Sequence, residues 1–85
     1  NFPNPFNPAT TIRFSLAEDG MTTLKIFDIM GREITTLAAE YLRQGAHEYQ
    51  WNGTNEYSQQ AATGIYFYRL QSGNNVSVKK MLLMK

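Results

Sequence analysis

Gly64-Ile65-Tyr66-Phe67-Tyr68-Arg69-Leu70 has the composition of a central β-strand. β-Branched and aromatic side chains dominate the stretch, and such residues pack well on a pleated sheet. Successive side chains of a strand point to opposite faces, so Tyr66, Tyr68 and Leu70 share one face. Ile65, Phe67 and Arg69 share the other. Because both faces are largely apolar, we expect this strand to be covered at least partly on both sides.

Tyr66 stands near the start of this strand and follows a polar run, Asn52 to Thr63, that predicts a long connection. A tyrosine in that position is typical of the tyrosine corner of Greek-key sandwiches, where the hydroxyl bonds to backbone a few residues upstream. Tyr66 is therefore the candidate for a tyrosine corner. The alternative is an aromatic core residue whose hydroxyl contacts solvent.

Composition favours one small domain that is stabilised by packing. The chain has 85 residues, a net charge of +1 and no cysteine, which excludes a disulfide framework and thiolate metal sites. This charge gives no reason to expect nucleic acid or an acidic membrane as a partner. No apolar run approaches the ~20 residues of a membrane span. The first residue is Asn1 and not methionine, so we expect either a domain cut from a longer polypeptide or the mature end of one.

The opening, Asn1 to Pro8, contains three prolines. Proline fixes φ and removes a donor, which predicts an extended lead-in along a sheet edge rather than a helix or an interior strand. We expect Phe2 and Phe6 to pack on the domain, the alternative being a flexible linker. The predicted division is a lead-in over residues 1–9 and a sandwich over residues 10–85.

Alternating apolar residues mark further strands. Thr10 to Leu16 predicts a half-buried strand, as does Gly45 to Trp51. Thr22 to Ile29 predicts a strand that ends in a tight turn, in which the Asp28 carboxylate accepts backbone N–H groups. The predicted core is a single cluster of seven residues: Ile12, Phe14, Leu24, Ile26, Trp51, Tyr66 and Tyr68.

Two segments break the alternation. Glu33 to Leu37 predicts a short strand, but Ala38 to Gln44 fits either a helical turn or an irregular crossing. In the tail, Asn75 to Lys85, the apolar phase changes at Lys79-Lys80. A β-bulge there is the favoured explanation, and burial of both faces near the strand end is the alternative. About seven short strands and almost no helix together predict an all-β, immunoglobulin-like antiparallel β-sandwich.

Residue types that carry catalysis or bind ligands are sparse. His47 is the only histidine, and no cysteine accompanies it. Asn52 to Glu56 loosely resembles a calcium loop, but only Glu56 is charged, so a turn is the better explanation. No phosphate-binding glycine loop and no Gly-x-Ser-x-Gly elbow is present. We therefore expect no enzymatic activity, no metal and no cofactor.

Phe27 and Phe67 fall in the outward phase of their strands, which an immunoglobulin-like sandwich places next to each other. Two adjacent phenylalanines on an outer face predict an apolar docking patch. The alternative is that the lead-in or a loop covers them.

Several pieces of sequence together resemble the type IX secretion system C-terminal sorting domains of type A. These pieces are Pro3-Asn4-Pro5-Phe6-Asn7-Pro8, Thr11-Ile12-Arg13-Phe14-Ser15-Leu16, Leu24-Lys25-Ile26-Phe27-Asp28, Gly31-Arg32-Glu33-Ile34, Trp51-Asn52-Gly53, Gly64-Ile65-Tyr66-Phe67-Tyr68-Arg69-Leu70 and Lys79-Lys80-Met81-Leu82-Leu83-Met84-Lys85. The related immunoglobulin-like domain of the flagellar hook-capping protein shares much of the middle, but less clearly the opening and the tail. Asn52 stands where many relatives have aspartate.

The resemblance implies a β-sandwich that carries an N-terminal passenger across the outer membrane. It implies passage through the periplasm, then the cell surface or the extracellular space. The implied partners are the type IX translocon or its shuttle components, and a sortase-like peptidase. The positions that match the family's sorting motifs are Pro3, Asn4, Pro5, Gly64, Tyr66, Lys79, Lys80 and Lys85.

Other roles remain open at the level of sequence. One alternative is that Pro3-Asn4-Pro5 only sets the geometry of the lead-in and that Gly64 and Tyr66 only build the corner. One alternative function is an adhesion or carbohydrate-contacting module of an extracellular enzyme. Another is a structural assembly domain of the hook-cap kind.

Overall fold

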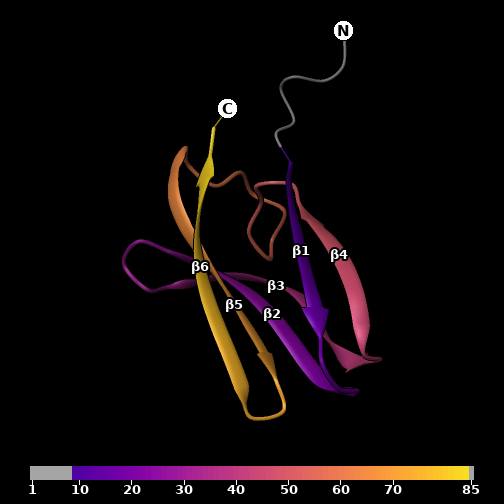
Figure 1. Cartoon of the computed structure of the whole chain (residues 1–85). Coiled ribbons are helices and arrows are strands. Elements are labelled where there is room, and N and C mark those ends of the chain that lie inside the picture. The colour runs from indigo at the N-terminus through magenta and orange to yellow at the C-terminus, as the bar shows by residue number, and fades with distance from the viewer. Residues whose placement is uncertain (1–8, 85) are drawn as a thin grey trace, which may run out of the picture.

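The computed structural model describes residues 9–84, which form six antiparallel strands in two sheets (Figure 1). The strands are β1 (Thr10–Leu16), β2 (Gly20–Asp28), β3 (Glu33–Leu42), β4 (Gly45–Trp51), β5 (Gly64–Ser72) and β6 (Asn75–Leu83). β1 pairs with β4, and the larger sheet has the order β3-β2-β5-β6. The predicted all-β sandwich is confirmed, with six strands in the described residues instead of about seven.

β5 lies inside the larger sheet, as its composition predicted. It pairs with β2 on one side and with β6 on the other. Tyr66 on its inner face is buried, whereas Phe67 and Arg69 on the outer face are half-buried.

The core lies between the two sheets. Its buried members are Ile12, Leu24, Ile26, Ala38, Trp51, Tyr66 and Leu83. Phe14 and Tyr68 are half-buried and pack against this cluster, so the seven-residue core predicted from sequence is confirmed. Each large apolar side chain buried here stabilises the fold by roughly 1.5–3 kcal/mol relative to exposure.

β3 is longer than the sequence predicted. It continues as a strand to Leu42, so neither a helical turn nor an irregular crossing follows Leu37. The register of β3 on β2 shifts twice, which leaves Ile34 and Leu37 as extra residues without a direct partner. Both extra residues pack against the core. Bulges of this kind reset the alternation of side chains, which is why the sequence pattern was lost.

The tail strand contains no bulge. β6 pairs with β5 in one unbroken register from Asn75 to Leu83. Leu83 is buried, whereas its neighbour Leu82 is exposed, so the strand end is not covered on both faces either. Lys79 is in phase with Leu83 but exposed, because β6 is an edge strand and the facing sheet has only two strands.

Candidate functional site

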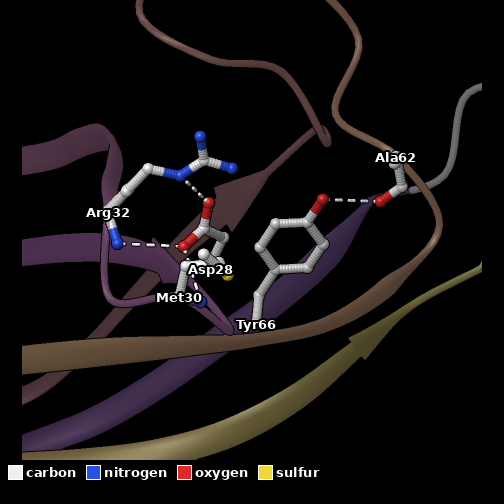
Figure 2. A network of polar contacts seen from close by, with 5 residues as sticks. All are labelled: Asp28, Met30, Arg32, Ala62 and Tyr66. Atoms are coloured by element: carbon white, nitrogen blue, oxygen red, sulfur yellow. Dashed lines mark hydrogen bonds and ion pairs between the residues drawn. The ribbon is translucent and has the colours of Figure 1, made fainter.

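Tyr66 forms the tyrosine corner that the sequence suggested. Its hydroxyl donates a 2.6 Å hydrogen bond to the backbone oxygen of Ala62 (Figure 2). Its ring meets the Trp51 ring edge-on, with centroids 5.1 Å apart. Burial, and secondarily the negative charge of Asp28, raises the pKa of the Tyr66 phenol above its usual value. Gly64 has a φ of 156°, a conformation that residues with a Cβ rarely adopt, so this glycine shapes the entry into β5.

Replacing Tyr66 with phenylalanine is expected to keep the aromatic packing and remove the bond to Ala62. The expected cost is about 1 kcal/mol, which lowers the melting temperature by roughly 4–8 °C in a domain of this size. Tyr57→Phe is the matched control, because Tyr57 is exposed. Equal melting temperatures for the two variants would show that the corner bond does not stabilise the fold.

Asp28 organises the turn between β2 and β3. Its Oδ1 accepts the backbone N–H groups of Met30 and Arg32, both at 2.9 Å, and its Oδ2 pairs with Arg32 Nε at 2.8 Å (Figure 2). Gly31 supplies the positive φ, 85°, that the turn requires. The Arg32 backbone N–H is the main reason that the pKa of Asp28 lies below its usual value, while burial acts in the opposite direction. The predicted turn is confirmed.

The lowered pKa of Asp28 predicts acid sensitivity. An aspartate titrates at about pH 3.9 in an unfolded chain. The stabilisation by Asp28 is therefore fully present above that pH, and it is lost as the pH falls through the lower folded-state pKa. We expect the melting temperature to fall more steeply in acid for the native domain than for Asp28→Asn. Parallel curves of melting temperature against pH would contradict this.

The loop before β5 uses its oxygen atoms to hold its own shape. Trp51 Nε1 donates to the backbone oxygen of Thr54 at 2.8 Å, and Thr54 Oγ1 donates to Asn52 Oδ1 at 2.7 Å. Asn55 Oδ1 accepts two backbone N–H groups of the following turn. These bonds fit the turn interpretation of residues 52–56. Within residues 9–84, no three histidine, cysteine or acidic side chains gather as metal ligands would.

Phe27 and Phe67 are direct partners across β2 and β5, and both are half-buried. The guanidinium carbon of Arg69 lies 5.1 Å from the centre of the Phe27 ring, within cation–π range. Arg69 Nε is buried and has no hydrogen-bond partner among the described residues. Arg69 therefore covers part of the face on which the docking patch was predicted.

Four of the sorting positions lie together on the β5–β6 hairpin. Gly64 and Tyr66 are on β5, and Lys79 and Lys80 are on β6, where both are exposed. Lys80 pairs with Phe67, which joins this lysine to the predicted docking patch. The remaining positions, Pro3, Asn4, Pro5 and Lys85, lie outside the described residues, as do Phe2 and Phe6 of the lead-in.

The family model of the secretion system C-terminal sorting domain matches residues 1–84. The chain belongs to this family. The match spans the proline-rich opening, the central segments and the tail, so the resemblance seen in the sequence is confirmed.

Two solved structures of hook-capping proteins contain a fold similar to that of this sorting domain. FlgD from P. aeruginosa is 12% identical with a TM-score of 0.70, over 88% of this chain and 59% of that one. FlgD from Xanthomonas campestris, whose structure is described as giving insights into hook capping essential for flagellar assembly, is 17% identical with a TM-score of 0.69, over 91% and 56%. The sorting domain thus spans less than three fifths of either structure. At these identities the likeness concerns the fold alone. No curated protein sequence matches the chain.

Sequence interpretation missed two residues of the hairpin. Arg69 was assigned only to the outer face, and its position over Phe27 depends on the neighbouring strand. Leu83 was not counted in the core, although its alternation with Met81 was visible in the sequence.

Residues 9–84 of the sorting domain include no helix with the length and apolarity needed to cross a membrane.

Proposed function

We propose that this sorting domain directs an exported passenger across the outer membrane by the type IX secretion system, for surface attachment or release. The observation that carries the proposal is the family match over residues 1–84. The passenger precedes the domain, passes through the periplasm, and ends at the cell surface or outside the cell. The role is recognition by the translocon or its shuttle components, and then by a sortase-like peptidase, and it requires no catalysis by the domain.

Within this proposal the sorting positions divide into two groups. Gly64 and Tyr66 act by shaping the corner, and this is supported by the φ of Gly64 and by the bond from Tyr66 to Ala62. Lys79 and Lys80 act by direct contact, and this is supported by their exposure on an edge strand. Pro3, Asn4, Pro5 and Lys85 complete the recognised set by their match to the family's motifs.

The test is surface delivery of a reporter fused ahead of the domain, behind an export signal, in a host that has the system. Deleting Met81 to Lys85 is expected to abolish delivery, but it also removes the buried Leu83. A triple variant, Lys79→Gln, Lys80→Gln and Lys85→Gln, leaves Leu83 in place and is expected to reduce delivery by at least about tenfold, as losing 1.4 kcal/mol of recognition would.

A reporter without the domain should stay in the periplasm and sets the background. Undiminished surface delivery by both the truncated variant and the triple lysine-to-glutamine variant would refute the proposal. If surface delivery is lost in the truncated variant alone, the secretion system requires a folded core and not the lysines.

An assembly domain of the hook-cap kind is the second candidate, favoured by the fold shared with the two hook-capping structures. It makes the opposite prediction in the same experiment, since surface delivery would not depend on the domain at all. Retention of the fused reporter in the periplasm, at the level of the reporter without the domain, would favour this candidate.

A further inference from the structure

β6 forms one edge of the larger sheet, and the described residues leave that edge open (Figure 1). Its register on β5 is unbroken, it contains no proline, and most of its residues are exposed. A long edge strand without bulges presents a row of free N–H and C=O groups to which another strand can pair. The opposite edge, β3, differs because its two register shifts distort the ladder.

The hairpin turn shows which backbone groups face this free edge. Ser72 pairs with Asn75 across two turn residues, and Gly73 at the first turn position has a φ of 58°. Such a two-residue turn closes with a hydrogen-bonded pair, after which bonded and non-bonded pairs alternate. The residues of β6 whose N–H and C=O groups point away from β5 are therefore Val76, Val78, Lys80 and Leu82.

The side chains of the same residues form an exposed apolar row that Lys80 interrupts. Val76 and Val78 are each 57% exposed, and Leu82 is 56% exposed. On the neighbouring strand, Ile65 pairs with Leu82 and is 39% exposed. A strand added to this edge would extend the outer face and cover this row.

The hairpin that carries this edge has positive charges and no negative ones. All seven acidic residues of the chain lie between Glu18 and Glu56. Arg69, Lys79 and Lys80 lie on β5 and β6, and none of them forms an ion pair with another described residue. An acidic strand would find unpaired cations on both faces of β6, because Lys79 and Lys80 point to opposite sides.

We propose that the free edge of β6 binds an extended, acidic segment of a partner protein, which adds a fifth strand to the larger sheet. Main-chain hydrogen bonds to Val76, Val78 and Lys80 supply the general affinity, as in other complexes formed by strand addition. The partner segment carries β-branched residues beside Val76 and Val78, and carboxylates beside Lys79 and Lys80. Opposite charges in such cross-strand positions are favourable.

A second copy of the domain is a poorer occupant of this edge. Antiparallel pairing of β6 with β6 brings the Lys79-Lys80 pairs of two copies together, and like charges in that position are destabilising. β3 is acidic at Glu33 and Glu40, but its two bulges spoil a continuous ladder. Strand order and charge favour binding of an acidic segment whether or not the domain is a sorting signal.

Amide hydrogen exchange of the purified chain tests the proposal. The probe is a capped peptide as long as β6, which alternates valine and threonine and has aspartate and glutamate at its centre. Without peptide, the amides of Val76, Val78 and Lys80 should exchange faster than those of Ser77 and Lys79. With peptide, these three amides should be protected. A matched peptide with two central lysines should bind at least about tenfold more weakly, as expected if the charges contribute 1.4 kcal/mol.

Val78→Pro removes one N–H group from the free edge of β6. Proline is tolerated in edge strands, so the domain should still fold. This variant should abolish peptide binding while the melting temperature stays within a few degrees, and Val78→Thr should bind normally. The double variant Lys79→Glu, Lys80→Glu should prefer the lysine peptide, which keeps the test valid if the proline variant does not fold.

Three results would overturn the proposal. The first is equal binding of the acidic and the lysine peptides. The second is acidic-peptide binding that survives Val78→Pro. The third is protection of the Val76 and Val78 amides without peptide in a chain that sediments as a dimer, since a second copy would then occupy the edge. None of these results bears on surface delivery of the reporter, so the two proposals can fail separately.

Discussion

Replacing Trp51 with alanine should lower the melting temperature by roughly 15 °C or more, or unfold the domain outright. Truncating a buried tryptophan costs about 3–5 kcal/mol. An 85-residue domain has a total stability of only about 4–13 kcal/mol, at roughly 0.05–0.15 kcal/mol per residue. Trp51 is 1% exposed, its ring meets that of Tyr66, and its indole N–H bonds to Thr54. Loss of this one side chain removes contacts between both sheets and the loop before β5.

Trp51→Phe is the matched control, because it keeps an aromatic ring in the core and loses the indole N–H. We expect a smaller fall in melting temperature than for alanine. Thermal unfolding followed by circular dichroism measures both. If Trp51→Ala melts within a few degrees of the native chain, the side chain does not hold the two sheets together.

Leu82 and Leu83 should respond very differently to the same substitution. Leu83 is 1% exposed and belongs to the core, whereas Leu82 is 56% exposed on the outer face. Leu83→Ala is expected to cost about 2–5 kcal/mol, which lowers the melting temperature by roughly 10 °C or more. Leu82→Ala removes the same atoms from the neighbouring position and should cost about 0.5 kcal/mol or less.

Gly53 has no side chain, and this leaves room for the Leu83 side chain to pack closely against its backbone. A Cβ at Gly53 would lie 3.3 Å from Leu83 Cδ1, and the φ of Gly53 is 79°. The pair of leucine variants also sharpens the delivery experiment. If Leu83→Ala and the triple lysine-to-glutamine variant both reduce delivery while Leu82→Ala does not, folding and direct recognition both contribute. Equal melting temperatures for Leu82→Ala and Leu83→Ala would contradict the burial pattern at the end of β6.

The sequence predicted those elements whose alternation is regular. β1, β2 and β4 follow a period of two, and β5 has apolar residues on both faces, so their existence and core residues could be inferred. Only the first half of β3, Glu33 to Leu37, could be inferred, because the bulges at Ile34 and Leu37 shift the phase inside one strand. In the tail, by contrast, a bulge was predicted and none is present in β6. Its phase change comes from an exposed edge strand whose inner face is covered only near Leu83, and coverage by another sheet is not a local property.

The candidate site was predictable to a similar extent. Tyr66 could be assigned because the corner depends on residues close to it in sequence. The tail lysines were found by family resemblance. The separation of the acidic residues from these lysines along the chain could be read directly from the sequence. The free edge of β6 could not be predicted, because alternation gives the faces of a strand and not its neighbours in the sheet.

The position of Leu83 also governs the order of events during synthesis. Leu83 is the last member of the buried cluster along the chain, and β1 must wait for β4 before it can pair. A chain that emerges amino end first therefore cannot close this core until Leu83 has left the ribosome. Pairing between distant strands is also slow compared with local folding. Under the proposed function, a passenger encoded ahead of this domain is therefore free to fold before the domain does.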